Sequence, residues 1–122
     1  MSEHDEQVAL FELLALYELK YPILQWIFAI PNGGARHPAV AAKMKAEGVK
    51  AGVWDVFVPV PVDDKCGLWI EMKFGKNSLS DEQKEFRRAL GDVFEWVVSY
   101  SAIKAAHTIG RYLGIRELEM VS

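Results

Sequence analysis

The chain has 122 residues, of which 51% are hydrophobic and 25% are charged, so it can bury a core and is not a disordered segment. Its single cysteine excludes an internal disulfide and a cysteine-based zinc site, and no stretch reaches the roughly 20 apolar residues of a membrane-spanning helix. The net charge is −3 and the N-terminus is acidic, the wrong sign for a secretory leader. We therefore expect one domain, residues 1–122, that stays in the cytoplasm and does not enter a membrane.

Helix and strand signals alternate along the chain. Residues 5–20 are rich in Leu, Ala and Glu and lack Gly and Pro, which predicts a long helix. The other expected elements are strands at 25–30, 53–60, 68–74 and 94–100, and helices at 39–47, 80–90 and 101–113. The strands 53–60 and 68–74 are expected to form a hairpin. The order helix, strand, helix, strand, strand, helix, strand, helix predicts an α/β fold with one mixed sheet and helices on both faces.

Three charged residues interrupt the apolar pattern of this hairpin. Glu71 and Lys73 are two positions apart in one strand, so their side chains point to the same face, and Asp55 interrupts the neighbouring strand. Charged residues are rarely buried unless they are paired or bound to a metal. Mg²⁺ takes oxygen ligands, which Asp55, Glu71 and the carbonyl of Met72 can supply. Lys73 would then orient a metal-bound water or stabilise the transition state of phosphodiester hydrolysis.

The residues alone leave structural alternatives open at each of these positions. A cross-strand salt bridge from Lys73 to Asp55 or Glu71 would explain the same charge pattern. Ser80 and Gln83 have the spacing of a helix capping box. The loop at 32–34 offers backbone amides to a phosphate, and a plain turn is its alternative.

Basic residues gather in two segments that flank the acidic positions. They are Arg36, Lys43, Lys45 and Lys50 in the first segment, and Lys73, Lys76, Lys84, Arg87 and Arg88 in the second. A solvated helix face would explain any one of these residues. Two basic segments around an acidic site instead favour binding of a nucleic-acid backbone.

Together, these segments resemble the VRR-NUC family within the PD-(D/E)XK nuclease superfamily, in its stand-alone phage or bacterial form. The resemblance covers residues 5–100 and rests on Ile30-Pro31-Asn32-Gly33-Gly34, Gly48-Val49-Lys50-Ala51-Gly52-Val53-Trp54-Asp55, Ile70-Glu71-Met72-Lys73 and Leu79-Ser80-Asp81-Glu82-Gln83-Lys84. It implies a restriction-endonuclease-like core, Asp55 and Glu71 as ligands of Mg²⁺ or Mn²⁺, and Lys73 as the catalytic lysine. It also implies that Gln83 faces the active site.

A glutamate of the first helix commonly joins such sites. Glu6 is preferred because it heads an apolar stripe of that helix, and Glu12 is the alternative. One departure from the family pattern is visible: the family usually has Pro before the aspartate, where this chain has Trp54. Trp adds bulk near the expected metal, which puts the fit of the substrate in question.

The resemblance implies a metal-dependent endonuclease that cuts DNA in replication, recombination or repair, in the cytoplasm of a bacterial or phage-infected cell. Branched or Holliday-junction-like DNA is the favoured substrate, and a homodimer would let two sites cut opposing strands. The expected nucleic-acid contacts are Asn32, Gly33, Arg36, Lys43, Lys50 and Lys76. The alternative function, which the net acidity and Trp54 favour, is a non-catalytic module on the same fold that binds nucleic acid or a replication partner. A nucleotide-dependent small-molecule enzyme ranks last, because the sequence has no glycine-rich nucleotide motif.

Overall fold

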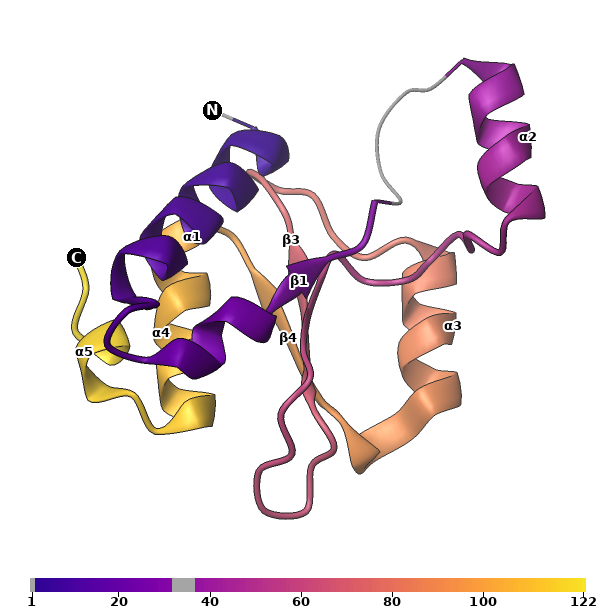
Figure 1. Ribbon diagram of the computed structural model, residues 1–122. Coiled ribbons are helices and arrows are strands. Elements are labelled where there is room, and N and C mark those ends of the chain that lie inside the picture. The colour runs from indigo at the N-terminus through magenta and orange to yellow at the C-terminus, as the bar shows by residue number, and fades with distance from the viewer. Residues whose placement is uncertain (1, 32–36) are drawn as a thin grey trace.

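A computed structural model describes residues 2–31 and 37–122 (Figure 1). The helices are α1 (Glu3–Tyr17), α2 (Pro38–Ala46), α3 (Asp81–Leu90), α4 (Ala102–Leu113) and α5 (Arg116–Glu119), with short 3-10 helices η1 (Pro22–Trp26) and η2 (Gly91–Val93). The strands are β1 (Phe28–Ala29), β2 (Val56–Val58), β3 (Leu68–Met72) and β4 (Glu95–Ser99). The expected contacts Asn32, Gly33 and Arg36 lie outside the described residues.

The strands form one mixed sheet in the order β1-β2-β3-β4. β2 and β3 are antiparallel, with Val56 opposite Ile70 and Val58 opposite Leu68. β4 runs parallel to β3, and α3 lies in the crossover that joins them. The predicted α/β order and the mixed sheet flanked by helices are confirmed, and β3 lies inside the sheet with every residue buried.

Alternation along β3 divides its side chains between two cores. Leu68, Ile70 and Met72 pack with residues of α1 and α4, whereas Trp69 packs with an aromatic cluster on the opposite face. Figure 1 shows α1 and α4 on one side of the sheet and α3 on the other. The same alternation places Glu71 on the α3 face of the sheet, with Trp69.

Some expected elements differ in the structure. Residues Gln25 and Trp26 belong to η1 and not to a strand, because Pro22 fixes its own φ and opens a tight turn, and Trp26 is 61% exposed. The strands expected at 53–60 and 68–74 are shorter than predicted. α5 was not predicted, since four residues are too few to show a helical period.

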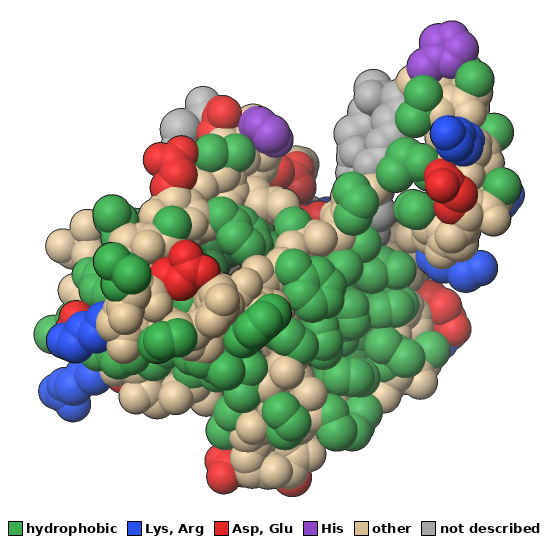
Figure 2. Space-filling view, viewed as in Figure 1, with side chains coloured by type: hydrophobic (Ala, Val, Ile, Leu, Met, Phe, Trp, Pro, Cys, Tyr) green, Lys and Arg blue, Asp and Glu red, His purple; other side chains and the backbone are tan. Residues whose placement is uncertain are grey.

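α2 stands apart from the other elements in Figure 1 and has no buried residue. In the space-filling view it forms a projection that carries lysine and histidine side chains (Figure 2). A short helix without packing contacts gains little stability from its own hydrogen bonds. Among the described helices, none is both long and apolar enough to cross a membrane.

Candidate active site

The side chains expected to form the site converge where the start of β2 meets the end of β3. Nζ of Lys73 lies 3.3 Å from Oε2 of Glu71, and both side chains are buried. The backbone N–H of Asp55 donates to Oε1 of Glu71 over 3.0 Å. The backbone N–H of Met72 donates to Oδ2 of Asp55, also over 3.0 Å. Antiparallel pairing brings these positions together, because Asp55 directly precedes β2 and Met72 ends β3.

The backbone of Met72 also contributes to this arrangement. The N–H and C=O of one strand residue point to the same side of the strand, and the Met72 N–H points at Asp55. The carbonyl of Met72 therefore points to the β2 side of the strand as well, while the Met72 side chain packs in the core with α1 and α4.

Gln83 reaches the site from the first turn of α3. Its Nε2 donates to Oε2 of Glu71 over 2.7 Å. Its Oε1 accepts from the backbone N–H of Ser80 over 2.9 Å, and Oγ of Ser80 accepts from the Gln83 N–H over 3.2 Å. The capping box and the contact with Glu71 are thus formed by the same glutamine, one end of the amide serving each.

Burial and like charge make both carboxylates harder to ionise. Burial raises the pKa of Glu71, to about 7 in total, and the neighbouring charge of Asp55 contributes in the same direction. Burial also raises the pKa of Asp55 above its ordinary value. Lys73 opposes both shifts. A bound cation would act in the same sense as Lys73, because it favours the charged form of both acids.

The oxygen donors suit a hard divalent ion. Within residues 2–31 and 37–122, no group of three or more His, Cys, Asp and Glu side chains is arranged to hold a metal. The oxygens that could hold an ion here are the carboxylates of Asp55 and Glu71 and the carbonyl of Met72. Mg²⁺ commonly binds through one or two carboxylates and completes its shell with water and substrate phosphate. The residues present therefore fit Mg²⁺ or Mn²⁺.

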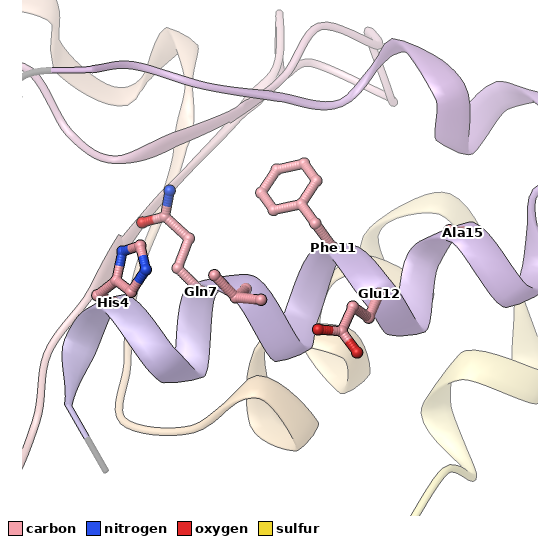
Figure 3. A pocket seen from close by; sticks show the side chains of 6 residues that line it. His4, Gln7, Phe11, Glu12 and Ala15 are labelled. Atoms are coloured by element: carbon pink, nitrogen blue, oxygen red, sulfur yellow. The ribbon is translucent and has the colours of Figure 1, made fainter.

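Three acids of α1 have different surroundings, namely Glu6, its alternative Glu12, and Glu3. Oε1 of Glu6 accepts from the backbone N–H of Ala102 over 2.8 Å, at the start of α4. Glu12 is exposed and lines a hollow along the outer surface of α1 (Figure 3). The acid whose charge raises the pKa of Asp55 is Glu3, the first residue of the helix.

Glu3 lies near Glu6, the acid of this helix that the sequence favours. At 3.6 residues per turn, Glu3 and Glu6 lie roughly 60° apart on one face of α1, whereas Glu3 and Glu12 lie about 180° apart. The helical period therefore places Glu3 and Glu6 on the same side of α1 and does not say which of them lies nearer Asp55.

The basic residues expected to contact nucleic acid lie on the surface. Lys43 is on α2, Lys50 follows that helix, and Lys76 lies in the loop after β3, and all three are exposed. None of them forms an ion pair with another residue of the described part of the chain. Arg88, by contrast, pairs with Glu85 on α3. The three lysines are thus free to meet an external anion.

Comparison with solved structures identifies the fold. One similar chain, described as "VRR_NUC domain protein", superposes with a TM-score of 0.71 and 23% sequence identity, covering 93% of this chain and 89% of that chain. The chain has a VRR-NUC fold. A scan against protein-family models finds no match, and neither does a search of the curated proteins.

Trp54 directly precedes Asp55, at the position where the resemblance noted in the sequence implies a proline. Its side chain is fully buried and packs edge-to-face against Trp96, with ring centroids 4.9 Å apart. The added bulk therefore lies in the aromatic cluster beside α3. With tryptophan before it, Asp55 contacts both Glu71 and Met72.

Proposed function

We propose that this protein is an endonuclease that uses Mg²⁺ or Mn²⁺ to hydrolyse DNA phosphodiester bonds. The observation that carries the proposal is the convergence of Asp55, Glu71 and Lys73 at one end of the β2–β3 pair, with Gln83 holding Glu71 from the next helix. The VRR-NUC fold supports the same assignment at the level of architecture. A salt bridge alone would explain Lys73 beside Glu71 but not the approach of the second carboxylate.

Each group of the site has a defined task in this proposal. Asp55, Glu71 and the Met72 carbonyl would hold the ion, which supplies an activated water and neutralises charge on the phosphate. Lys73, kept at 3.3 Å from Glu71, places a positive charge on the same face and stabilises the negative charge that develops on the phosphate. Gln83 fixes the rotamer of Glu71, and Glu3 adds a further negative charge near Asp55.

The exposed lysines supply the surface for a DNA backbone. Lys43 and Lys50 belong to the projecting α2 segment, and Lys76 follows the strand that carries Glu71 and Lys73. Backbone contacts of this kind give affinity without sequence readout. Branched or Holliday-junction-like DNA is the substrate we propose, in the cytoplasm of a bacterial or phage-infected cell.

Cleavage of synthetic DNA tests this function. Four-way, flapped and linear duplexes are incubated with the protein and Mg²⁺ or Mn²⁺, with a chelator as the negative control. Asp55→Asn and Glu71→Gln keep the side-chain shape and should abolish cleavage, whereas Glu12→Gln on the outer face of α1 should not. The proposal fails if the wild type cuts no strand, or if both variants cut as well as the wild type.

A non-catalytic binding module on the same fold is the second candidate. The net charge of −3 and the tryptophan before Asp55 favour it. It requires DNA or partner binding that is independent of divalent ions. Calorimetry with Mn²⁺ separates the two functions, since a saturable site that Asp55→Asn removes excludes the purely structural module.

We further propose a homodimer. β1 is an edge strand, and Phe28 on it is 46% exposed, next to the exposed Trp26 of η1. Figure 2 shows hydrophobic side chains gathered over the middle of this view of the molecule. Exposed apolar side chains at a sheet edge are typical of association surfaces. Sedimentation at several concentrations should show a dimer that Phe28→Ser weakens, and a monomer throughout would contradict it.

A further inference from the structure

Trp54 is joined to α3 by a hydrogen bond as well as by packing. Its indole Nε1–H donates to the backbone carbonyl of Gln83 over 3.0 Å. A buried indole N–H needs an acceptor, and here the acceptor is a backbone atom of the residue that contacts Glu71. The ring itself is fully buried against Trp96 and cannot swing away without opening the cluster.

The amide of Gln83 has one orientation that satisfies all of its contacts. Its oxygen accepts from the N–H of Ser80, which leaves the amide nitrogen to donate to Oε2 of Glu71. The bond to Glu71 is 2.7 Å long, so it depends on the position of the α3 backbone relative to β3. Trp54 holds that backbone at Gln83 itself.

A second close approach lies two residues before Trp54. Gly52 has φ +87°, and a Cβ built on it would lie 2.6 Å from the backbone oxygen of Glu82. The segment before Asp55 thus touches α3 at two consecutive residues, Glu82 and Gln83. Both contacts fix the first turn of the helix against the strand pair that carries the carboxylates.

We propose that Trp54 is a positioning residue that acts through Gln83 to hold the Glu71 carboxylate in its metal-binding orientation. The inference rests on the proposed function, because the orientation of Glu71 matters for metal binding only if the protein uses a metal. A chain of two hydrogen-bonded contacts leads from Trp54 through Gln83 to Glu71. The proposal thus gives a role to Trp54, the residue at which this sequence departs from the pattern that the resemblance implies.

The test compares two tryptophans of the same cluster. Trp54→Phe removes the indole N–H and keeps an aromatic ring. Trp96→Phe is a matched control, because its indole N–H also donates to a backbone carbonyl next to α3, that of Gly91, but at the opposite end of the helix. In the metal-free protein, the side-chain NH₂ resonances of Gln83 should exchange faster with solvent in Trp54→Phe and stay unchanged in Trp96→Phe.

Calorimetry with Mn²⁺ gives the second measurement. Outer-shell partners typically contribute about tenfold to a hundredfold in metal affinity, so Gln83→Ala should weaken binding by that much and Trp54→Phe by about threefold to tenfold. In the Gln83→Ala background, Trp54→Phe should have no further effect, because its route to Glu71 is gone.

Three results would overturn the assignment: unchanged Gln83 resonances in Trp54→Phe, equal effects of Trp54→Phe and Trp96→Phe on those resonances, or an undiminished effect of Trp54→Phe on Mn²⁺ affinity when Gln83 is alanine. A wild type that binds no Mn²⁺ overturns the proposed function instead. The resonance measurement still decides the role of Trp54 in that case.

Discussion

The backbone N–H of Asp55 donates to Oε1 of Glu71 over 3.0 Å, so one acidic residue supports the side chain of the other. Two carboxylates that repel each other are thereby held together by a backbone hydrogen bond. Their repulsion is visible in the pKa of Glu71, which burial and the charge of Asp55 raise to about 7. The site is thus built at a cost to stability, which a cation bound there would relieve.

The metal-free protein is expected to lose stability as the pH rises from about 4.5 to about 7. The ordinary pKa of Glu71 is 4.5, and the folded protein raises it to about 7. Between these values the folded state keeps a proton that the unfolded state has released, so raising the pH favours unfolding. The contribution of Glu71 to this loss is on the order of 3 kcal/mol. Chemical denaturation at about pH 5 and pH 8, with a chelator present, measures it.

Glu71→Gln is the variant that identifies the group responsible for this pH dependence. It should flatten the fall in the free energy of unfolding and make the metal-free protein more stable than the wild type at about pH 8. Glu12→Gln, on the exposed outer face of α1, should leave the fall unchanged. A full fall that persists in Glu71→Gln would assign the titration to another group.

Replacing Glu3 is expected to change the affinity for metal, whereas replacing Glu6 is expected to change the free energy of unfolding. Glu3→Gln should lower Mn²⁺ affinity by about twofold to fivefold, because it removes a negative charge that acts on Asp55 through space. Glu6→Gln should instead lower the free energy of unfolding by about 1 kcal/mol, since Glu6 satisfies the N–H of Ala102 at the start of α4. Calorimetry and denaturation measure the two effects, and Mn²⁺ affinity that falls only in Glu6→Gln would reverse the assignment.

The sequence predicted on which side of a strand or helix a side chain lies better than it predicted which residue that side chain contacts. Period-two alternation placed Glu71 and Lys73 together, and the structure has them 3.3 Å apart. Helical periodicity places Glu3 and Glu6 on the same face of α1. It does not give their partners, because the contact of Glu6 with Ala102 depends on where α4 begins, which a pattern within one helix does not contain.

Local patterns were also insufficient where an element is short or a contact spans the chain. Trp26 fits a strand by composition, but Pro22 and the short chain between α1 and β1 favour a 3-10 turn. The bond from Trp54 to Gln83 joins positions 29 residues apart, and no periodicity relates them. The order of the main helices and strands follows from the local sequence. A long-range contact such as that between Trp54 and Gln83 follows from tertiary packing.

DNA binding is expected to weaken steeply with salt, and the slope should depend on the α2 lysines. Each phosphate contact contributes about 0.9 to the slope of log affinity against log salt. Lys43→Gln and Lys50→Gln should therefore each reduce the slope by about one, while Lys65→Gln should not, because Lys65 donates to the backbone oxygen of Asp92. Fluorescence anisotropy across a salt series measures the slopes. Equal slopes for wild type and both α2 variants would show that these lysines do not contact phosphates.

Gly52→Ala is expected to damage both stability and the site, whereas Gly48→Ala should damage stability alone. Both glycines have positive φ, +87° and +101°, so alanine is strained at either position by about 1 kcal/mol. A Cβ at Gly52 would also meet the backbone of Glu82 at 2.6 Å, while at Gly48 it would meet nothing within 4 Å. The added overpacking brings the expected cost at Gly52 to roughly 2–4 kcal/mol.

The same clash should move the first turn of α3 and draw Gln83 away from Glu71. Mn²⁺ affinity is therefore expected to fall in Gly52→Ala and to remain at the wild-type value in Gly48→Ala, although both variants are less stable. Denaturation and calorimetry on the two purified variants separate the effects. If both variants lose the same stability and both keep wild-type Mn²⁺ affinity, the contact of Gly52 with α3 does not position the metal ligands.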